Sequence, residues 1–395
     1  MVRALAILLT FVFSATSALP SDTGDTDPTA LGGEVVQIVR EHFLDAERAK
    51  TWADRHVDYA SGIREQTEFA SRTNEVLGEL ETSHTQYYPR GSAGYWGLLA
   101  IFAEYLEVDS VEYDGIGVDV DERGFLRRVL AGGPAAEAGL LRGDRIVAVD
   151  GQPFRHVDPF AGQADTTVTV TIERAAEGTP IEIPVTPRRI NPKEEWLEAQ
   201  HEGATLFTRE GIGVAYLPVL WCVGDEVTEW IRESIAVTYR DAQAMILDFR
   251  DGWGGCNSDF LNYFNKTPPV LTVVYRDGKR FTYDPQWRKP LYVLINGGSR
   301  SGKEVVAHAL RRHEIGTLVG QQTAGFVVGG RPYLLSDGSL LYLAVADAVV
   351  DGERLEGVGA SPDFVVADQL EYAAGADPQL ERAIELAVEE CSLGR

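Results

Sequence analysis

A short unit between residues 291 and 310 constrains the fold most strongly. The apolar run Leu291–Ile295 predicts a buried strand, and the pattern Val305–Leu310 predicts the apolar face of a helix. Between them lies the turn Asn296–Glu304, which is rich in Gly and Ser. Because a buried strand here leads straight into a helix, the sequence predicts an α/β arrangement for this part of the chain.

Ser301 lies on this turn, immediately before the predicted helix. A hydroxyl in that position is exposed at the end of a sheet, and the first backbone N–H groups of the helix have no partner within it. Those N–H groups can stabilise a developing negative charge, as at the strand–turn–helix elbow that carries some serine nucleophiles. The alternative interpretation is an ordinary N-cap serine, because Ser is favoured at that position.

The overall charge limits the possible partners. The chain has 395 residues, enough for two or three domains, and its formal net charge is −24. Since nucleic acids and anionic membranes attract basic surfaces, neither is expected as a partner. The carboxylates are spread along the chain and indicate a solvated surface rather than an acidic tail.

The N-terminus predicts export. Arg3 precedes the apolar run Ala4–Phe13, and small residues follow up to Ala18. This order is typical of a secretory signal peptide over residues 1–18, so we expect a secreted or periplasmic protein with no other membrane segment. The run is short for a membrane span, and an uncleaved anchor is the alternative. Residues 19–30 are expected to form a disordered leader.

The chain contains three cysteines, Cys222, Cys256 and Cys391. The odd number leaves at least one of them unpaired within a monomer. Cys222 and Cys256 each end a strand-like run and could be neighbours, but the sequence leaves open whether they form a disulfide. No spacing of His and Cys predicts a metal site, and no cofactor is expected.

Residues 31–106 predict a helical domain. Apolar residues recur at spacings of three, four and seven, among them Val35, Ile38 and Val76. A polar stretch interrupts this pattern and contains Ser83 and His84. A lone His is often a structural residue, but an adjacent Ser on a loop between helices favours a functional pair.

Residues 111–189 predict a small β domain. Gly124–Leu130 and Thr167–Ile172 are typical of strands, and Gly133–Leu140 of a short helix with Pro near its start. The series Gly-Pro-Ala…Ala-Gly-Leu…Gly-Asp-Arg-Ile in this stretch resembles PDZ domains of bacterial proteases. That resemblance implies binding of an extended C-terminus by strand addition, its carboxylate held by the loop Gly115, Ile116, Gly117 and Val118. A domain of this fold that binds nothing is the alternative.

Residues 204–395 predict an α/β core. Gly211–Trp221 and Ala244–Arg250 are typical of strands, and an amphipathic helix is expected between them. The Gly-rich loop Asp251–Cys256 follows the second strand, at the strand end where ligands bind in α/β sheets. Within it, Gly254 and Gly255 allow the backbone to turn its N–H groups outward.

Four motifs in this order resemble the serine peptidase family of the carboxyl-terminal processing proteases and the tricorn core protease. They are Ser83-His84, Asp248–Gly255, Ser301–Glu304 and Glu356–Asp363. The resemblance covers nearly the whole chain after the signal peptide. It implies a multidomain α+β fold, with a helical domain, a PDZ-like β domain and an α/β catalytic core of ββα, crotonase-like units.

The family has two catalytic arrangements, and the turn Thr323-Ala-Gly-Phe326 distinguishes between them. The carboxyl-terminal processing branch uses a Ser–Lys pair whose Lys occupies the position of Phe326. Lys303 follows Ser301 by two residues, on a different face of any helix that starts there, and is a poor substitute. The resemblance therefore implies the tricorn-type tetrad, which comprises Ser301, His84, Ser83 and Glu356.

In this arrangement Ser301 is the nucleophile and His84 the general base, which the other two residues orient. The backbone N–H groups of Gly302 and of Gly254 or Gly255 would form the oxyanion hole. The implied function is an exported serine peptidase that acts on peptides or proteins, with its oligomeric state open. Two alternatives remain: an inactive relative that binds ligands or serves as a scaffold, and an esterase with the same tetrad.

Overall fold

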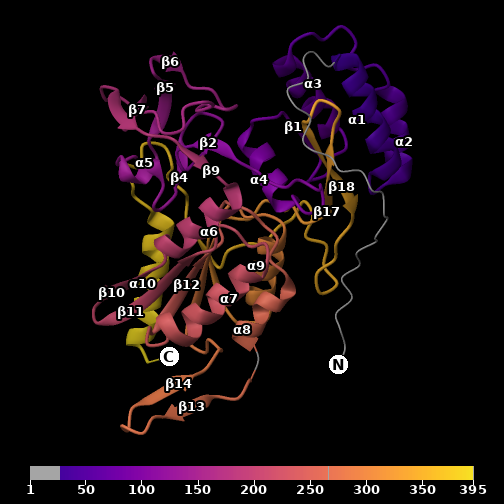
Figure 1. The fold of residues 1–395 in the computed structure, drawn as a ribbon. Coiled ribbons are helices and arrows are strands. Elements are labelled where there is room, and N and C mark those ends of the chain that lie inside the picture. The colour runs from indigo at the N-terminus through magenta and orange to yellow at the C-terminus, as the bar shows by residue number, and fades with distance from the viewer. Residues whose placement is uncertain (1–26, 266, 395) are drawn as a thin grey trace.

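The computed structural model describes residues 27–265 and 267–394. Figure 1 shows three parts: N-terminal helices beside a long hairpin, a β-rich part, and a sheet flanked by helices. The expected signal peptide and the expected leader up to residue 26 lie outside the described residues. No helix in the described ranges is long and apolar enough to cross a bilayer.

A six-stranded sheet forms the centre of the C-terminal part. Its order is β10 (Thr205–Arg209), β11 (Ile212–Pro218), β12 (Ala244–Asp248), β15 (Leu291–Ile295), β16 (Thr317–Gly320) and β19 (Phe364–Val365). β10 is antiparallel to β11, and all the following pairs are parallel. Every residue of β12 and β15 is buried, which explains why these strands are continuous apolar runs.

Helices cover both faces of this sheet. Met245 and Leu247 of β12 pack in one core with α6 (Pro192–Gly203), α7 (Asp225–Glu233) and α9 (Gly302–Arg312). Ala244 and Ile246 of the same strand pack in a second core with α10 (Pro378–Ser392). The alternation follows because successive side chains of a strand point to opposite faces of the sheet.

The carboxyl ends of β12 and β15 bring two turns together. Asp248 pairs in register with Leu294, so the chain leaves both strands at the same edge of the sheet. The Gly-rich loop 251–256 follows β12, and the turn into α9 follows β15. Hydrogen bonds join them: Ser299 Oγ donates to the Phe249 carbonyl at 2.9 Å, the Asn296 amide donates to Asp251 at 3.1 Å, and the Asp251 N–H donates to Asn296 Oδ1 at 3.2 Å. The loop and the turn are therefore held side by side.

The N-terminal helices share a core with a hairpin from near the C-terminus. This core combines α1 (Pro28–His42), α2 (Ala46–Arg55) and α3 (Gln66–Gly78) with the hairpin of β17 (Gly329–Leu334) and β18 (Leu340–Ala346). The short strand β1 (Gln86–Tyr88) also pairs with β18, and α4 (Ala93–Ile101) follows it. The helical part thus contains a hairpin that was expected within the α/β core.

Helix α1 begins at Pro28, inside the stretch expected to be a disordered leader. The side chain of Asp27 accepts a hydrogen bond from the Thr29 N–H at 3.0 Å and caps the helix. Pro at the first helical position needs no backbone donor there. These two residues start the helix before the first apolar residue of the pattern, Leu31.

The β-rich part spans residues 113–190. It contains the pairs β2 (Tyr113–Gly115) with β9 (Arg188–Ile190) and β3 (Val118–Val120) with β4 (Leu126–Val129), and the helix α5 (Pro134–Glu137). A four-stranded sheet has the order β6 (Gln152–Pro153), β5 (Arg145–Val149), β7 (Val168–Glu173) and β8 (Ile181–Val185). The strand and helix positions expected from the sequence agree with these elements to within a few residues.

A second hairpin, β13 (Leu271–Val274) with β14 (Arg280–Tyr283), extends away from the core near α8 (Asn262–Asn265), as Figure 1 shows. It forms a sheet of its own. It lies at the end of the core opposite the β-rich part.

Candidate active site

Ser301 lies directly before α9, in a backbone conformation that residues other than glycine rarely adopt. Its φ is 57° and its ψ −130°. Its N–H donates to the carbonyl of Phe326 at 2.8 Å and to the carboxylate of Glu304 at 3.1 Å. A strained residue costs on the order of 1–3 kcal/mol and persists only where its surroundings hold it in place. Here the neighbouring turn holds it.

Glu304 supplies most of that support. Its buried carboxylate also accepts hydrogen bonds from the Thr323 hydroxyl at 2.5 Å and from the N–H groups of Gly325 at 2.6 Å and Phe326 at 2.7 Å. Burial raises the pKa of Glu304, and these hydrogen bonds oppose that rise. The turn in which the related branch carries its lysine is therefore tied to the residue that precedes α9.

His84 is positioned by the pairing of β1 with β18. The strand begins two residues after the histidine, and Gln86 pairs in register with Tyr342. The imidazole lies against the Tyr342 ring, with 5.1 Å between the ring centroids. Like Ser301, His84 has a positive φ, 55°, which is uncommon for a residue other than Gly.

Ser83 connects His84 to Glu356. The Ser83 hydroxyl donates to Glu356 Oε2 at 2.9 Å, and the same hydroxyl oxygen lies 3.2 Å from His84 Nδ1. The only proton of the hydroxyl is used toward the carboxylate, so the oxygen accepts from the imidazole and Nδ1 carries the proton. His84 Nε2 is then unprotonated, and its lone pair can accept a proton.

Ser301 and His84 line the same cavity, which has a volume of about 260 Å³. No hydrogen bond joins the Ser301 hydroxyl to the imidazole among the described residues. Catalytic contacts in a structure without substrate are often looser than in the complex. The other walls come from the helical part, the Gly-rich loop and the turn before α9, including Tyr88, Trp253, Gly254, Gly255, Arg300 and Tyr342. The sequence analysis does not predict Arg300, Tyr88 or Tyr342 as site residues. For Arg300, its position next to Ser301 is a signal in the sequence; the two tyrosines have no such signal.

The cavity keeps His84 neutral. The pKa of His84 is lowered to about 4, mainly by burial. The Arg300 guanidinium contributes to this lowering, and the Glu356 carboxylate opposes it. A neutral imidazole can accept a proton, whereas an imidazolium cannot. The site therefore holds its histidine in the basic form down to mildly acidic pH.

The Gly-rich loop packs directly on Ser301. A Cβ atom on Gly254 would lie 2.9 Å from the Ser301 Cβ, so only glycine fits there. The described hydrogen bonds include none donated by the N–H of Gly254 or Gly255, and both residues line the cavity. Gly302 contacts the loop from the other side, against the backbone of Cys256. The three glycines proposed for an oxyanion hole thus lie around Ser301.

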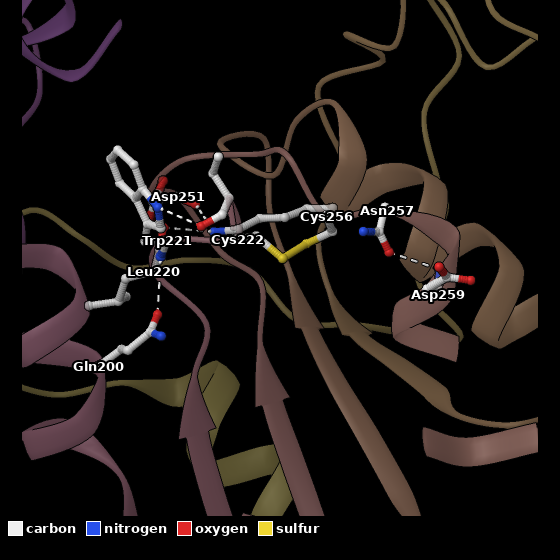
Figure 2. The surroundings of a disulfide bond; sticks show 10 residues. Gln200, Leu220, Trp221, Cys222, Asp251, Cys256, Asn257 and Asp259 are labelled. Atoms are coloured by element: carbon white, nitrogen blue, oxygen red, sulfur yellow. Dashed lines mark hydrogen bonds between the residues drawn. A yellow bond between two sulfur atoms is a disulfide. The ribbon is translucent and has the colours of Figure 1, made fainter. Parts of the chain in front are cut away.

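A disulfide between Cys222 and Cys256 fixes the end of this loop (Figure 2). It joins the loop to the segment that follows β11, where Gln200 of α6 also accepts a hydrogen bond from the Trp221 N–H. Both cysteines are buried, and Cys391 is free. The pairing that the sequence left open is therefore formed.

Lys303 is buried beneath the same loop. Its ammonium donates to the carbonyl of Asp251 at 2.6 Å and lies 3.5 Å from the carbonyl of Leu220. Burial lowers the pKa of Lys303 to about 7, and the Arg128 cation contributes to the shift. Lys303 is not among the residues that line the cavity of Ser301, and its contacts support the loop.

Arg250 and Asp248 also support the loop. The guanidinium of Arg250 makes hydrogen bonds of 2.8–2.9 Å to Asp248 and of 2.7–2.8 Å to Asp377, the N-cap residue of α10. Arg128 of the β-rich part donates to the Arg250 carbonyl at 3.0 Å. This network joins the β-rich part to the strand β12 and to the start of α10.

The loop expected to hold a peptide carboxylate lies against α6. Gly115, Ile116 and Gly117 are buried, and Val118 borders a cavity of about 130 Å³. The Glu195 carboxylate of α6 lies 3.3 Å from where a Cβ of Gly117 would be. Burial raises the pKa of Glu195 to about 7. Peptide binding at this loop stays a prediction.

Two segments of the chain match known protein families. Residues 214–366 match peptidase family S41, and residues 125–174 match the PDZ domain. The chain therefore contains one segment similar to S41 peptidases and one similar to PDZ domains, in the multidomain α+β fold predicted from the sequence. The resemblance to the carboxyl-terminal processing and tricorn proteases is confirmed.

Both branches occur among the similar proteins. The carboxy-terminal-processing protease of Bartonella bacilliformis is 29% identical over 287 residues, covering 66% of this chain and 62% of that protein. The carboxyl-terminal-processing protease of Synechocystis sp. is 26% identical over 393 residues, covering 93% and 88%. Tricorn protease homolog 1 of Streptomyces coelicolor is 27% identical over 381 residues, covering 90% of this chain and 34% of the homolog.

Solved structures show the same fold. The tricorn protease matches with a TM-score of 0.56 and 19% identity, over 90% of this chain and 36% of that one. The photosystem II D1 C-terminal processing protease matches with a TM-score of 0.52 and 19% identity, over 90% of this chain and 99% of that one. At such identities the likeness concerns the fold alone.

Proposed function

We propose that this chain is an exported serine peptidase with a tricorn-type tetrad. Ser301 is the nucleophile, His84 the general base, and Ser83 and Glu356 orient the imidazole. The observation that carries the proposal is the cavity that Ser301 and His84 share, with the Ser83–Glu356 contact directly behind the histidine.

The reaction follows from these positions. His84 Nε2 removes the proton of the Ser301 hydroxyl as its oxygen attacks the carbonyl carbon of the scissile peptide bond. The N–H groups of Gly302 and of Gly254 or Gly255 stabilise the oxyanion. The imidazolium then protonates the leaving amine, the C–N bond breaks, and an acyl-enzyme remains. A water molecule, deprotonated by the same nitrogen, hydrolyses that ester and restores the serine.

Labelling with a fluorophosphonate probe tests the proposal, because such probes react with activated serines. The wild-type protein should be labelled, and the Ser301→Ala and His84→Ala variants should not. Equal labelling of the Ser301→Ala variant would refute the assignment of the nucleophile. Absence of labelling in the folded wild-type protein would favour an inactive relative.

Substrate class is tested separately. A peptidase should cleave members of a peptide library, with loss of cleavage in the Ser301→Ala variant. An esterase with the same tetrad would hydrolyse simple esters and leave the peptides intact.

Export is part of the proposal and has its own test. The signal-peptide pattern of residues 1–18 supports it, and the buried disulfide is typical of an oxidising compartment. Mass spectrometry of the protein from its native source should show a mature N-terminus near residue 19. An intact N-terminus in a cytosolic fraction would contradict export.

A further inference from the structure

Arg300 stands out among the arginines near the site because its guanidinium makes no hydrogen bond or ion pair within the described part of the chain. Its Nε is buried without an acceptor. The neighbouring cations differ: Arg250 pairs with two carboxylates, and Arg128 lies 3.6 Å from Asp248. Burying a cation costs free energy unless an anion pairs with it. The described surroundings of Arg300 supply no such anion within ion-pair distance.

The guanidinium is held in place without being neutralised. Its Cζ lies 5.6 Å from the centre of the Trp253 ring, in a cation–π contact. Such a contact orients a cation but leaves its N–H groups free for hydrogen bonds. Trp253 is fixed in turn, because its indole packs on Gly97, where any Cβ would collide with the ring. Arg300 is therefore an oriented and unpaired donor.

The cavity that Arg300 shares with Ser301 and His84 contains no carboxylate in its lining. Two acidic residues lie on the other side: Asp119 of β3 and Glu195 of α6 line the smaller cavity together with Arg300. Asp119 is not within ion-pair distance of the guanidinium, although Arg300 lowers its pKa while burial and Asp251 raise it. On the side of the catalytic residues, the side chains that line the cavity with Arg300 are therefore neutral.

We propose that Arg300 is a specificity-determining residue that binds a carboxylate of the substrate beside the scissile bond. The inference rests on the proposed peptidase function and names its substrate class: peptides with a negative charge close to the cleaved bond. That charge can be an Asp or Glu side chain or the C-terminal carboxylate. Both present the same two oxygens, and a guanidinium can bind both oxygens at once.

Peptide binding to the full chain with Ser301→Ala tests this without turnover. Two pairs of labelled hexapeptides are compared by fluorescence polarisation: a free C-terminal acid against its amide, and internal Glu against Gln with the C-terminus amidated. The charged member of at least one pair should bind roughly 10–100-fold more tightly, as expected for a charge-assisted hydrogen bond. The pair that responds identifies the source of the carboxylate.

The same peptides are then measured with Arg300→Gln added to the Ser301→Ala background. The preference for the charged member should disappear, while affinity for the neutral member stays within about threefold, since the neutral peptide makes no charge-assisted bond. Arg331→Gln is the matched control, because Arg331 also stacks on an aromatic ring, Tyr105 at 5.9 Å, but does not line the cavity. It should leave the preference intact.

Two results would overturn the inference. One is equal binding of both members in both pairs. The other is a preference that survives Arg300→Gln, which would place carboxylate recognition elsewhere, such as in the PDZ domain. Failure of the proposed function looks different, since the wild-type chain would then cleave no peptide whatever the binding preference. Arg300→Gln removes one cation–π contact but no observed hydrogen bond or ion pair, so the variant should remain folded, as its circular dichroism would show.

Discussion

Glu356 accepts hydrogen bonds from both the backbone N–H and the hydroxyl of Ser83, at 2.8 and 2.9 Å. The N–H groups of Val327 and Val328 donate to the same carboxylate at 2.8 and 3.1 Å. Burial raises the pKa of Glu356, but these hydrogen bonds outweigh it and hold the pKa below its ordinary value. The carboxylate is therefore ionised at neutral pH and determines which way the Ser83 proton points.

This relationship predicts unequal effects of two substitutions. In Glu356→Gln, the amide can donate to Ser83, the hydroxyl then donates to His84 Nδ1, and the imidazole is left in the wrong tautomer. We expect kcat to fall by about 10³–10⁴, as for the aspartate-to-asparagine change in a serine protease triad. Ser83→Ala removes one neutral hydrogen bond and should cost less, roughly 10-fold. Glu353→Gln, at an exposed carboxylate, is the control. Equal kcat for Glu356→Gln and wild type would contradict the conclusion that Glu356 sets the tautomer of His84 through Ser83.

The pKa of His84, lowered to about 4, predicts activity at mildly acidic pH. The acid limb of kcat/KM should lie near pH 4 rather than near 6.5, because that limb reports the base of the free enzyme. Arg300→Gln removes a nearby cation, eases protonation of the imidazole and should move the limb to higher pH. A neutral, amidated peptide substrate keeps the test independent of carboxylate binding. An acid limb near pH 6.5 in the wild type would contradict the buried, neutral histidine.

The disulfide predicts a combined loss of stability and rate. It closes a loop of 34 residues, so Cys222→Ala/Cys256→Ala should lower the free energy of unfolding by about 3–4 kcal/mol. Since Cys256 adjoins Gly254 and Gly255, kcat should fall more than KM rises. Urea unfolding and steady-state kinetics measure both quantities. Cys391→Ser removes the free cysteine and should change neither. An unchanged kcat in the double variant would show that the loop does not need this bond.

Lys303 predicts how stability depends on pH. Its pKa is lowered from 10.5 to about 7 in the folded chain, mainly by burial. Between these values the unfolded chain binds one more proton, so the contribution of Lys303 to stability rises with pH from about 7 to about 10.5. Lys303→Met should lack this rise. The difference in unfolding free energy between the two proteins should therefore change steadily across pH 7–10, measured by urea denaturation.

The control for this comparison is Lys279→Met, at a lysine that is 82% exposed. It should give a curve parallel to that of the wild type. A parallel curve for Lys303→Met as well would mean that the buried lysine keeps an ordinary pKa.

The local elements of the site could be predicted, because each depends on neighbouring residues. An apolar run and a cluster of Gly and Ser predict the strand and the turn before Ser301. The glycine series of residues 111–189 predicts the PDZ-like strands. What the sequence does not encode locally is long-range contact. The partner of Cys222, the burial of Lys303 beneath the Gly-rich loop, and the position of Glu195 beside Gly117 all depend on segments that only the folded chain brings together.

The helical part is the clearest case of this limit. Its periodicity predicts helices but not what their apolar faces cover, and that surface includes β17 and β18 from a later part of the chain. The start of α1 at Pro28 was missed for a different reason, since a polar, Pro-containing stretch resembles a disordered leader until Asp27 is seen to cap it.

The pairing of β1 with β18 has a consequence for biosynthesis. A ribosome synthesises the histidine-bearing segment well before Leu340–Ala346, the strand on which it packs. A nascent chain lacks the surface that orients His84 and cannot assemble the cavity. The candidate site therefore cannot form during synthesis until β18 has been made.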